Sequence, residues 1–517
     1  MSSSFYGIQI AKTGLSISQQ QLSVTAHNIS NVNTTGYTRQ SLATSSIPAA
    51  SSNVAFTSHK VEVGQGVRAD GVVQIRSAFL DYQYRDQNTT SSKWSAKSQY
   101  YSYVEDLFNN ELADDTDGGT GISGVLADFY TSLDKLNESP ANAETRANVQ
   151  QNAIKLTETI NDYFNSLLSQ QKALDDNVKT TVDQINIYAQ QIASLNGQIA
   201  GYELSGDRAN DLRDQRNLVL DELSGLIQFS YSEDGDGNVN IQIGTRSLVK
   251  GTTTNQMAVN ATYANPVKSG TQNNLYEVYW ADSNGNPTSS KVEITNGALA
   301  GYLEVRDGND SNTKGIPYVV SQLNSLCQKI TKDVNNIHKT GYTMPNASNS
   351  NVSQTNINFF KDTSTGQDAS LVTAENFSVS DEVKLSIYNI AASDTLVTVD
   401  SSGNMQQGNG SIALQLAKLV DSSNSSGTDA SFSSLFKTIV TGIGIEMSHI
   451  QDIAETQLVL QNHLSSQRQS ITGVSLDEEM TNMIQFQHAY SAASRVITAM
   501  DEQLNTLING TGLVGRG

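Results

Sequence analysis

Both ends of this chain carry a row of positions spaced alternately three and four residues apart, the spacing of a helix that buries one face. At the N-terminal end the row runs without a break from residue 8 to residue 32. We therefore predict an amphipathic helix there, with bulky and small side chains alternating along one face. The bulky positions are Ile8, Leu15, Leu22 and Ile29, and the small ones are Ala11, Ser18 and Thr25.

The C-terminal end shows the same spacing, again unbroken. An isolated helix with one apolar face gains little in water until another helix covers that face. We expect the two terminal helices to pair, because the small N-terminal positions leave room for bulkier C-terminal side chains. Such a pair has a thin core, so neighbouring copies should supply further burial. The C-terminal row consists of Met483, Phe486, Tyr490, Ala493, Ile497, Met500, Leu504 and Leu507.

The middle of the chain contains a longer apolar row from residue 160 to residue 202. As a helix it would span about 65 Å, which predicts a rod rather than a globule. Further helical patterns cover residues 210–227, 316–338 and 432–471, so we expect an elongated antiparallel helical bundle. Between the helices, alternating apolar residues flank Gly/Asn/Asp clusters, as in β-hairpins. The predicted fold is mainly α with β insertions.

The 517 residues are too many for one hydrophobic core, and the length alone predicts about three or four domains. We divide the chain into a terminal helical domain, a helical bundle domain, and one or two outer β-rich domains. These cover residues 1–75 with 473–517, residues 76–225 with 298–340 and 411–472, and residues 226–297 with 341–410, respectively.

Charge narrows the possible partners. The formal net charge is -20, which repels nucleic acid phosphates and anionic lipid heads. Because of this charge, nucleic acid binding is not expected. No apolar run approaches the length of a membrane span, so membrane insertion is not expected either. The opening residues lack a basic and apolar signal peptide, so export would need another route. Cys327 is the only cysteine, and it falls on the apolar face of the predicted helix 316–338, which makes it a core residue.

Catalytic motifs are not visible, and we predict no catalytic residue, no metal site and no cofactor. The six histidines are scattered, without a zinc motif or a nucleophile elbow. The segment 63–71 lacks the spacing of a phosphate loop, and we interpret it as a tight turn between strands. Alternating acidic residues near Asp234 resemble a calcium loop, but the required glycine and terminal Glu are missing, which favours a hairpin tip.

An asparagine-rich segment, AHNISNVNTTGYTRQ at residues 26–40, follows the predicted N-terminal helix. Asparagine tolerates left-handed backbone geometry and glycine permits positive φ, so the segment suits a helix end followed by a fixed turn. On composition alone it is an ordinary helix stop. The candidate motif residues are Asn28, Asn31, Asn33, Gly36 and Tyr37.

This segment resembles the N-terminal signature shared by flagellar rod, hook and hook-associated proteins. Residues 475–508 resemble the matching C-terminal signature, and their FQHAYSAASR stretch looks most like the hook-associated protein 1 family. Internal stretches are similar to the same family in order and spacing, and rod and hook proteins lack this internal set. The internal stretches are residues 210–227, 244–251, 296–307 and 335–342.

The resemblance implies a structural subunit at the junction of the flagellar hook and filament, not an enzyme. Such a protein would be exported through the flagellar type III apparatus and assembled outside the cell through its terminal helices. The implied partners are further copies in a helical ring, the hook protein, a second junction protein on the filament side, and a cytoplasmic chaperone on the C-terminal row. Alternatives are a hook or rod subunit, or a secreted coiled-coil adhesin.

Overall fold

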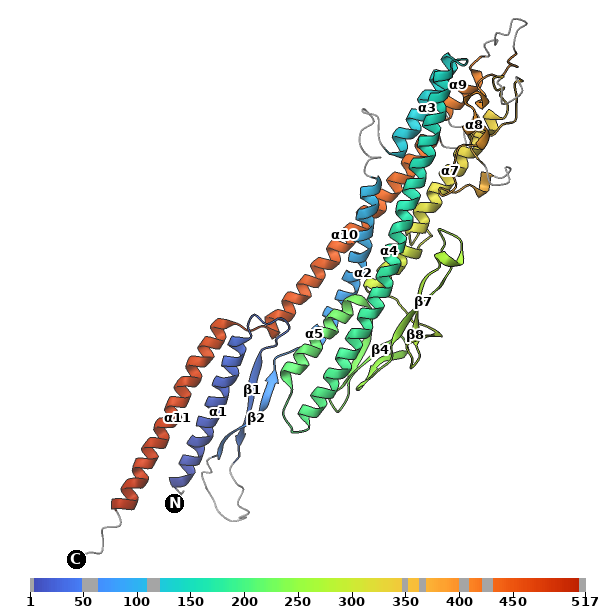
Figure 1. The fold of residues 1–517 in the computed structure, drawn as a ribbon. Coiled ribbons are helices and arrows are strands. Elements are labelled where there is room, and N and C mark those ends of the chain that lie inside the picture. The colour runs from blue at the N-terminus through green and yellow to red at the C-terminus, as the bar shows by residue number, and fades with distance from the viewer. Residues whose placement is uncertain are drawn as a thin grey trace, which may run out of the picture.

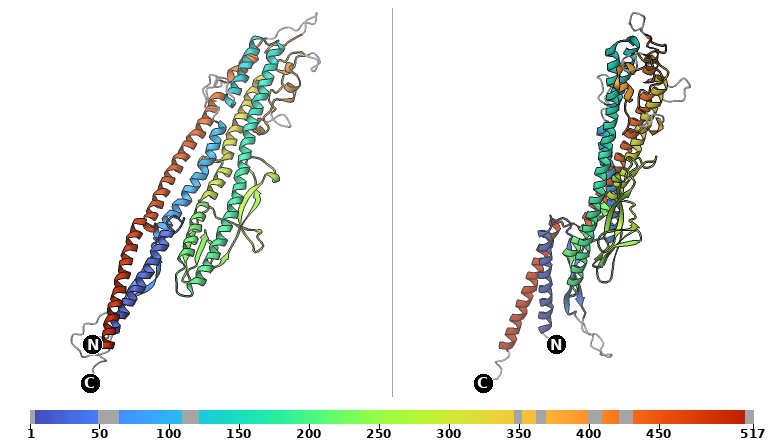
Figure 2. Two further views of the ribbon diagram at one scale, coloured as in Figure 1. Left: turned by 60° about the vertical axis from the view of Figure 1, so that its left-hand side comes forward. Right: turned by 45° about the vertical axis from the view of Figure 1, so that its right-hand side comes forward.

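The computed structural model describes residues 4–48, 64–108, 121–345, 352–361, 369–398, 409–420 and 431–510. The molecule is long, narrow and mainly helical (Figure 1). Both termini lie at one end, where α1 (Ser4–Ser30) and α11 (Leu476–Gly510) run side by side. Two further views show the helical bundle rising away from this pair (Figure 2). The predicted fold class, mainly α with β insertions and paired terminal helices, is confirmed.

Helix α4 (Ala143–Glu203) forms the spine of the bundle. It begins at Asn142, whose side chain accepts a hydrogen bond from the Glu144 backbone N–H and so caps the first turn. The apolar row predicted from residue 160 starts earlier, because Val149 and Leu156 are buried on the same face. The helices around α4 are α2 (Ala78–Phe108), α3 (Ile122–Glu138), α5 (Asn210–Leu226), α6 (Ala298–Asp307), α7 (Ile316–His338), α9 (Ser411–Ala417) and α10 (Phe432–Thr472).

Two apolar cores hold the bundle together. The first joins α3, α7 and the first halves of α4 and α10 at the end far from the termini. Cys327 is fully buried in this core, as predicted. The second joins the last part of α4 to α5 and the inserted strands. Neither core contains a residue of α1 or α11, so the terminal pair is a separate packing unit.

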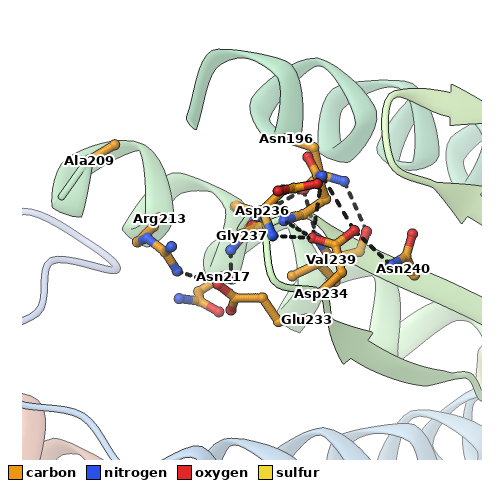
Figure 3. A network of polar contacts seen from close by, with 12 residues as sticks. Asn196, Ala209, Arg213, Asn217, Glu233, Asp234, Asp236, Gly237, Val239 and Asn240 are labelled. Atoms are coloured by element: carbon orange, nitrogen blue, oxygen red, sulfur yellow. Dashed lines mark hydrogen bonds and ion pairs between the residues drawn. The ribbon is translucent and has the colours of Figure 1, made fainter. Parts of the chain in front are cut away.

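The inserted strands form two small antiparallel sheets on one side of α4. The predicted hairpin tip is confirmed, since the Asp234 carboxylate accepts hydrogen bonds from the backbone of its own turn, at 2.9 Å from Asn238 N. Figure 3 shows this turn between Asn196 of α4 and Arg213 of α5. The strands are β3 (Ser230–Glu233), β4 (Val239–Ile243), β5 (Arg246–Lys250), β6 (Thr253–Thr254), β7 (Met257–Tyr263), β8 (Leu275–Ala281) and β9 (Pro287–Lys291).

The prediction of a β-rich region at residues 341–410 is wrong for its described part. That part holds the short helix α8 (Asp381–Leu385), single helical turns and isolated bridges, but no strand. Its aromatic side chains enter the first core one by one rather than along an alternating strand face. The side-chain amide of Asn335 bonds the backbone of Phe359 and Phe360, which replaces a neighbouring strand.

A third small sheet lies against α1. It pairs β1 (Gln40–Ile47) with β2 (Gly66–Gln74) in antiparallel register. The tight turn predicted over residues 63–71 is therefore wrong where the chain is described, because residues 66–71 belong to β2. The Thr13 hydroxyl of α1 accepts a hydrogen bond from Val67 N at 3.3 Å. Within the described residues, no helix has an apolar stretch long enough to cross a membrane.

Candidate functional site: the terminal helix pair and its joint with the bundle

Two contacts fix how α1 and α11 pair. The Asn28 amide donates to the Glu479 carboxylate at 3.2 Å. At the other end, Gly7 lies so close to the Met500 side chain that a Cβ atom at residue 7 would clash with it. The two contacts are three heptads apart along α1, and they are also three heptads apart along α11. The two rows of the sequence analysis therefore meet in one antiparallel register.

Most residues of the two predicted rows lie at this contact, but the depth of burial differs from our expectation. The small positions Ala11, Ser18 and Thr25 are buried, because α1 lies between α11 and the β1–β2 sheet. The bulky N-terminal positions are only half-buried. On α11, Tyr490 and Leu507 are exposed, at 37% and 50%. The half-buried members are Ile8, Leu15, Leu22, Ile29, Met483, Phe486, Ala493, Ile497, Met500 and Leu504.

Helix α11 has a second apolar strip that our reading of the sequence missed. Met480 and Ile484 are exposed, at 57% and 54%. We call these two residues the free strip. They are spaced four residues apart on a face beside the predicted row, a signal that was present in the sequence but hidden because only one register was followed. A helix with apolar residues on two faces is typical of one that contacts two partners.

The signature after α1 is built around Asn28, which is 1% exposed. Its side-chain oxygen accepts from the Gln40 backbone N–H at 3.0 Å and from the Tyr37 hydroxyl at 2.8 Å. Burial, with the nearby carboxylates of Asp211, Asp214 and Glu479, raises the pKa of Tyr37. The signature is therefore a hydrogen-bonded turn that returns the chain against α1.

The other signature residues have smaller roles. Gly36 has φ +79°, a conformation that L-residues rarely adopt, and faces the Leu218 side chain. The Asn31 amide donates to the His27 carbonyl at 3.0 Å and closes the end of α1. Asn33 is exposed.

Arg39, which the sequence analysis did not single out, fastens the start of α11. Its guanidinium bonds Glu479 and Glu478, each at 2.7 Å, and its backbone N–H donates to the Thr472 carbonyl at 2.8 Å. The Glu479 side chain is 2% exposed. A buried carboxylate needs such partners, because removing one leaves an uncompensated charge.

On the bundle side, the Asp214 carboxylate of α5 binds the segments at the start and the end of the hairpin. Its carboxylate accepts from Thr38 N at 2.9 Å, from the Thr38 hydroxyl at 2.6 Å and from the Gln74 amide at 2.8 Å. The Arg76 guanidinium lies 3.6 Å away and also pairs with Asp81 at 2.6 Å. Burial raises the pKa of Asp214 to about 6, against the opposing effect of these donors.

An open cleft of about 940 Å³ lies at the joint. The signature turn forms one wall, α5 another, and the end of α10 with the turn to α11 a third. Its lining is mainly polar. The described residues contain no group of three His, Cys, Asp or Glu side chains that could hold a metal ion.

Comparison with known proteins identifies relatives of this chain. Residues 104–360 match the model of the flagellar hook-associated protein FlgK helical domain. Over its full length, the chain is 32% identical to the flagellar hook-associated protein 1 of Bacillus subtilis, and the alignment covers 100% of both proteins. The chain belongs to the flagellar hook-associated protein 1 family. It is therefore a structural protein of the bacterial flagellum and not an enzyme.

Other relatives agree with this assignment. The hook-associated protein 1 of Escherichia coli is 26% identical over 97% of this chain and 99% of its own length. Flagellar rod models match only the two ends, residues 8–38 and 465–510, so the alternative of a rod or hook subunit is set aside. The fold resembles that of the flagellar hook junction protein FlgK from Burkholderia pseudomallei, with a TM-score of 0.58 and 17% identity over 75% of this chain and all of that one.

Proposed function

We propose that this hook-associated protein 1 family member forms the junction between the flagellar hook and the filament, and that it assembles through its terminal helices. The observation that carries the proposal is the free strip of α11, two exposed apolar residues on a helix whose other face is already covered by α1. Such a strip is unfavourable in water and is covered when copies meet. The partners would be further copies in a ring, the hook protein, and a second junction protein on the filament side.

In this proposal each of the three regions of the chain has its own role in the assembled flagellum. The terminal domain, residues 1–75 with 473–517, makes the contacts along the flagellar axis. The bundle, residues 76–225 with 298–340 and 411–472, makes lateral contacts. The inserted sheets within residues 226–297 face outward, and the described part of residues 341–410 covers the end of the bundle, whose first core it enters. The two apolar cores support the separation of the terminal domain, since no described residue of α1 or α11 belongs to either.

We further propose export through the flagellar type III apparatus, with a cytoplasmic chaperone on the C-terminal helix. The exposed side chains of α11 support this, because an unassembled subunit needs them masked against aggregation. Deletion from residue 470 onward should abolish chaperone binding in a pull-down experiment. Retention of binding by the truncated chain would show that the chaperone binds elsewhere on the chain.

A deletion strain tests the junction itself. We expect hooks without filaments, with full-length filament protein shed into the medium, and restoration by the wild-type gene. Normal filaments on the deletion strain would contradict a junction role and would favour a secreted adhesin.

A variant test addresses the terminal helices. Met480→Gln with Ile484→Gln should fail to restore filaments while keeping the thermal unfolding of the isolated subunit, because both side chains are exposed in the single chain. Ser491→Gln, also at an exposed position of α11, is the control and should restore filaments. Restoration by the double variant would show that the free strip is not an assembly surface.

A further inference from the structure

The terminal unit, consisting of α1, the β1–β2 hairpin and α11, meets the bundle through polar contacts. Both apolar cores lie within residues 94–450, so neither reaches the terminal unit. Only two stretches of chain connect the two bodies. They are Ile75–Ser77, between β2 and α2, and Gly473–Ser475, between α10 and α11. Two bodies that share no apolar core and are joined by two short connections can change their relative angle without unpacking either one.

The side-chain contacts across the joint converge on the first turns of α5, and one backbone bond, from Arg39 N to the Thr472 carbonyl at 2.8 Å, joins the terminal unit to the end of α10. Asp214 accepts from Thr38 and Gln74, as described above. Beside it, the Asp211 carboxylate accepts from the Gln40 amide at 2.9 Å, and the Asn210 amide donates to the Val72 carbonyl at 2.9 Å. Asp214 accepts three of the bonds across the joint and is only 5% exposed.

The bundle keeps its own structure up to the joint. The Arg468 guanidinium on α10 bonds the Asp221 carboxylate on α5 at 2.5 Å and lies over the Tyr84 ring on α2 at 3.9 Å. Below the turn, Arg39 fastens the start of α11 to the terminal unit. Bending is therefore confined to the turn Gly473–Ser475 and the link Ile75–Ser77, and the open cleft beside them leaves room for it.

We propose that the signature turn and the start of α5 form a latched joint, in which Asp214 holds the terminal unit at one angle to the bundle and its release lets the unit swing as a rigid body. The two motifs of the joint, residues 26–40 and 210–227, are far apart in the chain and meet here. The inference concerns the isolated subunit and stands independently of the proposed junction function.

Distance distributions between spin labels test the latch in the full chain. One label pair, Gln20→Cys with Thr180→Cys, spans the joint, and a second, Gln20→Cys with Gln487→Cys, lies within the terminal unit. All three positions are exposed. The buried Cys327 is replaced by alanine throughout, so that it takes no label.

Asp214→Ala removes the acceptor and should broaden the distribution across the joint about twofold or more, leaving the distribution within the unit unchanged. Thr38→Val, which removes one hydroxyl donor, should broaden it less. The matched control is Asp70→Ala, a hairpin carboxylate whose partners among the described residues are Ser45 and Arg68 of the same hairpin. Circular dichroism confirms that each variant retains its helices.

Two results would overturn the proposal. Unchanged distributions across the joint in both Asp214→Ala and Thr38→Val would mean that other contacts fix the angle. Broadening within the terminal unit, together with that across the joint, would mean that the unit unfolds rather than swings.

Discussion

At the residue scale, His338 is a polar side chain that is fully buried at the end of α7. Its Nδ1 lies 2.7 Å from the Ile357 carbonyl, and its Nε2 accepts from the Ala391 backbone N–H at 2.8 Å. The ring therefore donates at Nδ1 and is neutral. Burial first, and the Arg146 charge as well, lower the pKa of His338 to about 4, against the effect of the Ile357 bond.

This lowered pKa predicts acid sensitivity. Below a pH of about 6.5 the unfolded chain binds a proton at residue 338, whereas the folded chain does not. The stability that the neutral imidazole contributes is therefore present above that pH and is lost as the pH falls toward about 4. The loss amounts to about 3 kcal/mol of the free energy of unfolding. Denaturant unfolding at several pH values should show this slope in the wild type and a smaller one in His338→Gln.

The control for this prediction is His488→Gln, at an exposed position of α11. It should keep the wild-type slope. Equal slopes in the wild type and His338→Gln would contradict a neutral, buried imidazole.

Sequence reasoning found Cys327 but missed His338, although it singled out the stretch 335–342. Cys327 lies on a repeating apolar face, so local spacing indicates its burial. The partners of His338 come from residues 357 and 391, and nothing near it in the sequence indicates them. Asp214 and Arg39 were missed for the same reason, because their partners are more than a hundred residues away.

At the element scale, the pairing of α1 with α11 depends on a polar contact at one end. Asn28 makes four hydrogen bonds, to both backbone groups of Gln40, the Tyr37 hydroxyl and Glu479. Polar residues buried between helices are known to select one register among several. We expect the same of Asn28, since the small positions of α1 would also tolerate a shift along α11.

Asn28→Ala should therefore weaken the pairing of α1 with α11 by more than the loss of a side chain of this size would predict. It leaves the buried Glu479 with Arg39 as its remaining side-chain partner, at a cost of about 2 kcal/mol. Hydrogen exchange of the α1 and α11 backbone amides should become roughly thirtyfold faster, while that of α4 stays unchanged. Asn33→Ala, an exposed position of the same signature, should exchange like the wild type. Equal protection in both variants would assign the register to the apolar row alone.

The elements themselves were largely predictable, because helices of this length repeat their apolar face many times. Helix α7 has the predicted bounds, and α5 and α10 differ from theirs by one residue. The misassigned region, residues 341–410, has no such repetition. Its β-branched and aromatic residues are also typical of a chain that covers the end of a bundle, where side chains such as Asn335 satisfy its backbone.

At the scale of the whole molecule, the sequence predicts three regions but not how they are joined. The domain proposal groups residues 1–75 with 473–517, and both apolar cores lack the residues of these ranges that the structure describes, which supports it. The angle at the joint depends on Thr38 and Gln40 meeting α5, contacts that helical spacing cannot reveal. Our prediction of an elongated shape came from helix length alone and is confirmed (Figure 1).

Because the two bodies share no core, removal of α11 should leave the bundle intact. A chain ending at residue 475 should unfold at nearly the wild-type temperature when followed through its buried tyrosines, which lie in the first core. The same chain should lose the hydrogen-exchange protection of α1, because α11 covers one side of that helix. A large fall in the unfolding temperature would show that the terminal pair stabilises the bundle, and the two bodies would then be one cooperative unit.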